Sequence, residues 1–268
     1  MRVPAVVERR VTRAPVAAGT LYAEEPDELR QAVDDLLEES ARAPRRGLRA
    51  LVVPHAEHAR SGGVAAAAFA RMPLSARVVL LGPSRIVPLA GLAVSGADAW
   101  TTPLGDVRVS SRLRRRAVGL GALVDDAPHE HEDALEVQLP FLQRTCVNGL
   151  EILPVAVGSC VPSDVVRLLD ALDAVAVVST NLSHDLSEGE ATHRDDETIH
   201  AVLRSETHGF REGDVSGVFA LRGIVELAKR HELETELVQR RLAPESTGDT
   251  ERVAGYASFT ISSASSSG

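Results

Sequence analysis

Cysteines, aromatic residues and long apolar runs are all scarce in this sequence of 268 residues. The two cysteines, Cys146 and Cys160, provide neither a disulfide framework nor a CxxC metal pattern, which favours a reducing compartment. No stretch approaches the ~20 consecutive apolar residues of a membrane span, and the N-terminal segment lacks the apolar stretch of a signal peptide. We therefore expect a cytoplasmic protein that does not enter a membrane.

An excess of positive charge is also missing. The chain has 29 Lys and Arg residues against 38 Asp and Glu residues, which gives a net charge of −9. A general nucleic-acid binder needs a basic face to neutralise phosphates, so this balance argues against one. The single basic run, Arg112 to Arg116, lies in a polar stretch that is typical of a solvated helix face. Aromatic residues make up only 3% of the chain, so an aromatic substrate has no special support.

Short apolar runs do occur, and they alternate with helical segments. The runs at 48–53, 77–81, 152–157 and 174–179 are unbroken, which is typical of strands in a sheet that is covered on both faces. The helical segments begin at Pro26 and continue at 61–71, 134–143, 163–172, 190–204 and 215–231. Two late stretches, 235–242 and 253–261, alternate apolar and polar residues and indicate more peripheral strands.

Strands that alternate with helices predict the α/β class, with a mostly parallel or mixed central sheet flanked by helices. No internal repeat or linker divides the chain, so we predict a single layered domain over residues 1–261. Residues 262–268 are rich in serine and are predicted to form a flexible tail.

Polar and ionisable residues follow three of the expected strands directly, in the segments Pro54–His58, Gly82–Arg85 and Thr180–Asp185. In open α/β sheets, ligands bind where loops leave the carboxyl ends of the strands. A single histidine at a strand end is more often structural than catalytic. Three such strand ends in one chain favour a shared site for the set.

A fourth polar segment, His129–Asp133, comes directly before an expected helix. Carboxylates in this position are favoured by the helix dipole, so the segment can act as a helix cap. It can equally supply ligands or acid–base groups to the same crevice. The spacing of the residues does not separate these two interpretations.

These segments, taken in order, resemble the motifs of the Memo family, whose bacterial members are called AmmeMemoRadiSam system protein B. AAGTLY at 17–22 resembles the N-terminal signature of the family, and PHA at 54–56 with Ser61-Gly62 resembles its PHAGY…SG loop. Four further matches are LLGPSR at 80–85, TPLGD at 102–106, EDALEVQLPF at 132–141 and STNLSH at 179–184. The resemblance implies the fold of class III extradiol dioxygenases. It also implies a pocket lined by His, Asp and Cys, with metal-dependent redox activity.

Several pocket positions depart from the family pattern. His55 and His184 match histidines of the family motifs, whereas Arg85 and Asp133 each stand where a histidine is expected, and Asn181 stands for an aspartate. We place the later Cys-Gly pair of the family at Arg222-Gly223, which removes the cysteine as well. The PHAGY motif reads PHAEH and so adds Glu57 and His58, as substrate-binding residues or as exposed loop residues.

These replacements argue against the inherited metal site. Iron, copper and zinc need the lone pairs of imidazole, carboxylate or thiolate groups. Arginine has no lone pair to offer and is always protonated. Arg85 and Arg222 would instead bind a carboxylate, phosphate or sulfate group.

Three functions stay open. The favoured one is a metal-free enzyme for a small anionic molecule, in which His55 and His184 exchange protons as general base and acid. Asp133 or Glu132 would then orient one imidazole, and Asn181 would hydrogen-bond the reacting oxygen. Another function is that of a non-catalytic binding or scaffold protein.

The remaining function is that of an oxidoreductase with non-haem iron or copper, whose metal ligands differ from those of the family. Its ligand set would be His55, His58, Asp133 and His184, a combination of histidines with one carboxylate.

Overall fold

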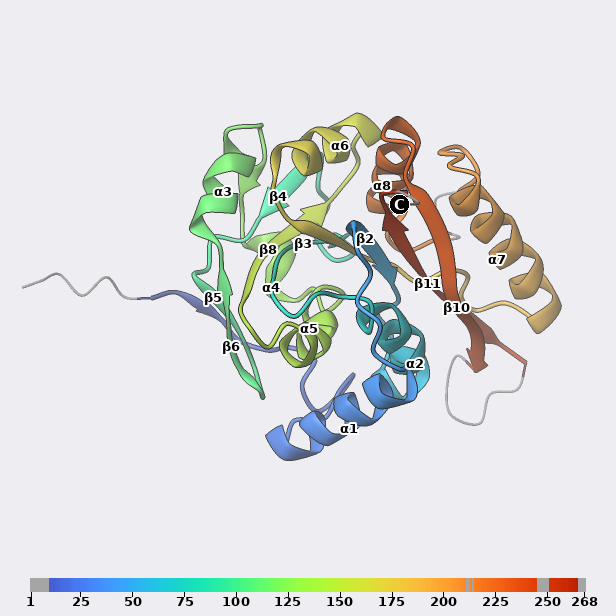
Figure 1. The fold of residues 1–268 in the computed structure, drawn as a ribbon, viewed down its shortest axis with the longest axis horizontal. Helices are drawn as coiled ribbons and strands as arrows, with labels where there is room; N and C mark the ends of the chain where they lie inside the picture. The colour runs from blue at the N-terminus through green and yellow to red at the C-terminus, as the bar shows by residue number, and fades with distance from the viewer. Residues whose placement is uncertain (1–9, 211–212, 214, 245–250, 265–268) are drawn as a thin grey trace, which may run out of the picture.

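An 11-stranded mixed sheet runs through the molecule, in the order β1-β5-β6-β8-β3-β9-β2-β11-β10, with β4 on β8 and β7 on β4 (Figure 1). The computed structural model describes residues 10–210, 213, 215–244 and 251–264. The strands are β1 Thr12–Arg13, β2 Leu48–Val53, β3 Ala76–Pro83, β4 Leu92–Val94, β5 Ala99–Thr102, β6 Gly105–Val109, β7 Leu123–Val124, β8 Leu150–Val157, β9 Val175–Ser179, β10 Glu234–Pro244 and β11 Val253–Ser262. The predicted α/β class with a mixed central sheet is confirmed.

Helices cover both faces of this sheet (Figure 1). They are α1 Pro26–Glu39, α2 His58–Phe69, α3 Ser111–Val118, α4 Ala127–Glu130, α5 Leu139–Thr145, α6 Pro162–Ala171, α7 Glu188–Leu203 and α8 Val218–Arg230, with a 3-10 turn η1 at Glu136–Gln138. Helices α1, α2 and α5 pack on one face, and α3, α6, α7 and α8 contribute to the core on the other. None of the helices in the described ranges is both long and apolar enough to cross a membrane.

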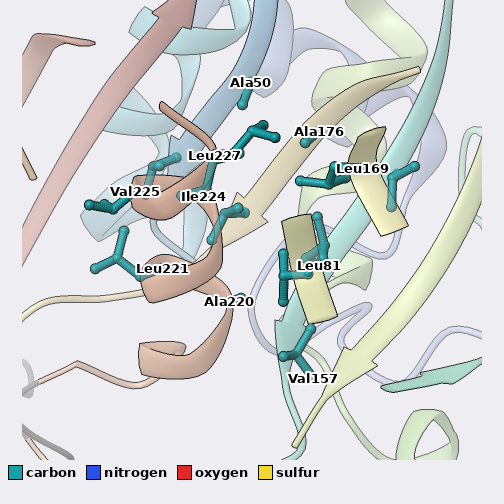
Figure 2. Close-up of a cluster of buried hydrophobic side chains, with 14 of the residues drawn as sticks. Ala50, Leu81, Val157, Leu169, Ala176, Ala220, Leu221, Ile224, Val225 and Leu227 are labelled. Atoms are coloured by element: carbon teal, nitrogen blue, oxygen red, sulfur yellow. The ribbon is translucent and has the colours of Figure 1, made fainter. Parts of the chain in front are cut away.

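The central strands are buried on both faces of the sheet, which explains why their sequences are unbroken apolar runs. In β2, Ala50 and Val52 pack into the core under α8, whereas Leu51 and Val53 pack into the core under α1 and α2. Successive side chains of a strand point to opposite faces, so a strand buried on both faces needs an apolar residue at every position. Figure 2 shows the α8 side of this arrangement, where Ile224 lies on the side of α8 that faces the strand residues.

The late strands differ from the sequence prediction. β10 is an edge strand as expected, but β11 lies between β10 and β2 and is buried along its whole length. Ser258 and Thr260 produced the apparent polar alternation, and both are buried. The predicted tail also begins too early, because Ser262 is the last residue of β11 and binds Arg45 Nε through its Oγ at 2.8 Å. Residues 265–268 of that tail lie outside the described residues.

Two helices start later than predicted, and both starts shape the site. The segment 134–143 divides into η1 and α5, with Pro140 in the first turn of α5. Helix α8 begins at Val218 because Gly217 is its N-terminal cap residue, so Ser216 lies in the preceding loop. The basic run was predicted correctly: Arg112, Arg115 and Arg116 are exposed on α3.

Candidate active site

The carboxyl ends of β3, β9 and β2 lie next to one another because these strands are parallel neighbours. His55 follows β2, Asn181 follows β9 and Arg85 follows β3. The backbone N–H of His55 donates to Asn181 Oδ1 at 2.8 Å, which joins two of these loops directly. The structure thus brings three of the predicted site residues to one edge of the sheet.

His55 is held in one tautomer by the groups around Ser179. The Ser179 hydroxyl donates its only proton to the carbonyl of Ala134 at 2.5 Å and accepts from Gln138 Nε2 at 2.9 Å. Its remaining lone pair faces His55 Nδ1 at 3.1 Å, so Nδ1 carries the proton and donates. The second ring nitrogen, Nε2, therefore presents a lone pair.

The imidazole of His55 is neutral around pH 7. Burial lowers its pKa to about 3, and the positive charge of Arg85 contributes to the same shift. Only 2% of the His55 surface is exposed. The ring is therefore a proton acceptor in the resting state, with its lone pair on Nε2.

The lone pair of His55 Nε2 points at a residue that sequence reasoning missed, Ser216. The two atoms, Ser216 Oγ and His55 Nε2, are 3.2 Å apart. The backbone N–H of Asn181 donates to Ser216 Oγ at 2.9 Å, which leaves the serine proton directed at the imidazole. The sequence held a signal for it, since Ser216-Gly217 directly precedes the apolar helix α8.

Arg85 is not a free anion-binding group. Its Nε donates to Glu132 Oε1 at 3.0 Å, its backbone N–H donates to Glu132 Oε2 at 3.0 Å, and its Nη2 contacts both Glu132 and Asp133. Asp133 therefore pairs with Arg85 and does not orient an imidazole, and burial raises the pKa of the Asp133 carboxyl. The Arg85 guanidinium, which we expected to bind a substrate anion, is already paired with two carboxylates of the protein.

A cavity of about 440 Å³ opens beside Ser216. Its walls are the end of β3 and the loop after it, the end of β8 and the residues after it, and residues 216–219, which form the end of the loop before α8 and the first two residues of the helix. Arg85 lines it, whereas His55 lies behind Ser216 and does not. A molecule in this cavity would meet the Ser216 hydroxyl before it met the imidazole.

Two other predicted residues, Glu57 and His58, lie away from this cavity. His58 packs between Tyr22 and Phe141, with ring centroids at 5.5 and 4.7 Å, and its Nε2 donates to the carbonyl of Val137 at 3.0 Å. Glu57 pairs with Arg60 at 2.7 Å, and with His58 it lines a different cavity of about 740 Å³ between α1 and α2. The expected substrate role of Glu57 and His58 in the shared pocket is therefore corrected.

His184 and Arg222 are also displaced from the expected site. His184 is exposed, in the loop that leads from β9 toward α7. Arg222 lies in the second turn of α8, where its Nη2 donates to the carbonyl of Phe210 at 2.7 Å and its guanidinium lies 6.0 Å from the centre of the Phe219 ring. It does not line the cavity with Arg85.

The donor groups at this edge do not fit iron or copper. Both ring nitrogens of His55 already contact serine hydroxyls, and Arg85 adds positive charge beside them. In residues 10–210, 213, 215–244 and 251–264, no group of three or more His, Cys, Asp or Glu side chains is arranged to hold a metal ion. The expected set of His55, His58, Asp133 and His184 is therefore not brought together.

Comparison with known proteins identifies the family. The family model for Memo-like proteins matches residues 13–260. This chain belongs to the Memo family. It is 35% identical over 205 residues to a MEMO1 family protein of Aquifex aeolicus, covering 73% of this chain and 76% of that protein. It is 28% identical over 265 residues to a MEMO1 family protein of Methanosarcina barkeri, covering 93% and 99%.

Membership in the Memo family makes the position of the Cys-Gly pair important, and the structure corrects it. Ser216-Gly217, not Arg222-Gly223, lies at the pocket. A Cβ at Gly217 would lie 2.8 Å from the carbonyl oxygen of Ser179, so only glycine lets this loop approach the end of β9. The residue that precedes this glycine at the pocket is a serine, Ser216.

Proposed function

We propose that this Memo family protein is a metal-independent enzyme in which neutral His55 accepts a proton during a reaction on a small molecule. The observation that carries the proposal is the hydrogen-bond network that keeps the proton on Nδ1 and turns the Nε2 lone pair toward the cavity wall. A general base needs this combination of correct tautomer, hydrogen-bond reach and access to the reacting group. His184 has no part in this mechanism, because it is exposed and does not line the cavity.

We retain a small anionic compound as the proposed substrate. Support comes from the start of α8, where Val218 and Phe219 line the cavity. The first N–H groups of a helix lack intrahelical partners and favour negative charge. Arg85 adds positive charge to the same wall, although its guanidinium is paired with Glu132 and Asp133. The helix start, more than Arg85, would therefore receive a negative charge in this cavity.

The test is turnover of a panel of small carboxylate-bearing esters and phosphate monoesters by the purified full chain and two variants. We predict that His55→Gln lowers turnover about 100-fold or more, because the general base is lost. The exposed His184→Gln is the matched control and should leave turnover unchanged. A thermal melt of each variant separates loss of chemistry from loss of fold.

Two results would remove the proposal. Equal turnover by the wild type and His55→Gln would show that the imidazole is not the base. If no compound in the panel reacts, a non-catalytic binding protein becomes the better interpretation. The pairing of Arg85 with Glu132 and Asp133 would then have a structural role only.

A further inference from the structure

We propose that Ser216 is a nucleophile that forms a covalent acyl intermediate, and that the substrates are activated acyl compounds such as esters and thioesters. This inference rests on the proposed function of His55 as a base and adds the group from which His55 takes the proton. It is carried by the position of Ser216, which contacts His55 Nε2 at 3.2 Å on one side and lines the cavity on the other.

The surroundings of Ser216 fix the direction of its hydroxyl proton. The backbone N–H of Asn181 donates to Ser216 Oγ at 2.9 Å, and His55 Nε2 accepts from it. The imidazole is oriented in turn by Ser179, whose hydroxyl accepts from Nδ1. A nucleophile, a base and a group that orients the base are the three parts that activate a serine.

The start of α8 supplies the complementary charge for an acyl reaction. Attack on a carbonyl places negative charge on its oxygen, and that charge needs hydrogen-bond donors arranged in advance. Val218 and Phe219, the first two residues of α8, line the cavity next to Ser216. Their backbone N–H groups belong to the helix turn that has no intrahelical acceptor.

The reaction proceeds in two balanced steps. Ser216 Oγ forms a bond to the acyl carbon while its proton passes to His55 Nε2, and the carbonyl π electrons move to the oxygen. When the carbonyl re-forms, the bond to the leaving alcohol or thiol breaks, and the leaving group takes the proton from His55. Water then attacks the acyl-serine, gives a proton to His55, and releases the carboxylic acid as the proton returns to Ser216 Oγ.

His55 Nδ1 contacts the Ser179 hydroxyl and not a carboxylate, so no negative charge stabilises the imidazolium that forms when Nε2 takes the Ser216 proton. The site therefore favours activated acyl groups. Burial and the nearby Arg85 keep the pKa of His55 at about 3, so the imidazole is a weak base. A weak base assists attack only when the acyl carbon is strongly electrophilic, as in aryl esters and thioesters. The cavity of about 440 Å³ has an apolar wall that includes Leu89 and Val157, which suits a small acyl chain.

The proposal is tested with a fluorophosphonate probe, which reacts with activated serines, and with p-nitrophenyl acetate. The wild-type protein should gain one probe molecule per chain, and peptide mapping should place it on Ser216. Ser216→Ala should lose labelling and reduce ester hydrolysis about 100-fold or more. Ser111→Ala is the matched control, because Ser111 is exposed at the start of α3 and does not line the cavity.

The outcomes separate this inference from the proposed function. If Ser216→Ala keeps its turnover while His55→Gln loses it, His55 acts on water or substrate directly, and the nucleophile proposal is wrong. If both variants keep their turnover, both proposals are wrong. Labelling at another serine, or no labelling of folded wild-type protein, also overturns the assignment of Ser216.

Discussion

At the scale of single residues, the buried carboxylate of Glu136 connects two distant segments of the chain. Its Oε1 accepts from the Tyr22 hydroxyl at 2.6 Å and from the Ala17 N–H at 2.8 Å, and its Oε2 pairs with Arg13 Nη1 at 2.5 Å. These donors satisfy both oxygens of the buried carboxylate. Burial and the neighbouring Glu136 raise the pKa of Tyr22, so the phenol keeps its proton and donates it.

Replacing Glu136 tests this arrangement. Glu136→Gln keeps the size of the side chain but leaves the guanidinium of Arg13, which is 8% exposed, without its counter-charge. We predict a loss of about 3–5 kcal/mol in the free energy of unfolding, measured by urea titration. The control Asp34→Asn breaks the half-exposed pair with Arg144 and should cost less than about 1 kcal/mol. Equal losses in the two variants would contradict a special role for the buried pair.

The residues of the candidate active site show how far single positions can be predicted from the sequence. His55 was identified correctly as a strand-end residue of the shared edge, because an imidazole directly after a buried strand is a local pattern. The partners of Arg85 and the exposure of His184 depend on loop paths that no local pattern describes. Ser216 was missed because a serine in a loop has chemical meaning only beside the base that faces it.

At the scale of elements, the start of α8 depends on close packing against α6. A Cβ at Gly223 would lie 2.3 Å from the Cβ of Val165, so no side chain fits between the two helices. Ser216 lies in the loop directly before this helix. Gly223 is therefore a packing residue and not part of a ligand pair.

We predict that Gly223→Ala destabilises the protein by about 1–3 kcal/mol, because the helices must move apart to accept the methyl group. The measurement is the urea midpoint, with ester turnover as a second readout of the displaced α8. Gly189→Ala in α7 is the control, since a Cβ there meets nothing within 4 Å. It should be neutral or stabilise by up to about 1 kcal/mol. A fully stable and active Gly223→Ala would contradict the packing argument.

Elements themselves were predicted well where their pattern is long. The four central strands and the helices α1, α6 and α7 occur close to the predicted ranges, since each buries a regular apolar face or run. The short strands β1, β4 and β7 have two or three residues, too few for a periodic pattern. β5 and β6 were also missed, in a pair joined by a tight turn at Gly105.

At the scale of the whole molecule, the sheet order places strands from distant parts of the sequence together. β2 lies between β9 and β11, although about 120 residues or more separate it from each along the chain. The sequence predicted the α/β class from the alternation of elements. The order of strands depends instead on which helices cover which face, and no single segment encodes that choice.

Burial of neutral histidines is a further property of the whole molecule. Burial lowers the pKa of His55 to about 3 and that of His129 to about 4, and it also lowers the pKa of His58. Unfolding exposes these rings and returns them to the ordinary value near 6.5. As the pH falls below about 6.5, the unfolded chain binds protons that the folded chain does not, so the folded state loses stability.

His129 isolates this effect, because it lies outside the candidate active site and its Nε2 donates to the carbonyl of Ala93 at 3.2 Å. Each buried neutral histidine should lower the free energy of unfolding by about 1.4 kcal/mol per pH unit between the two pKa values. We predict that His129→Gln reduces the slope of stability against pH by that amount between about pH 6 and 4.5, whatever its effect at pH 7. Urea titrations of both proteins across this range give the slopes. Their difference cancels the opposing effect of Asp133 and Asp195, whose pKa values are raised by burial. Parallel slopes would mean that His129 takes up a proton in the folded protein.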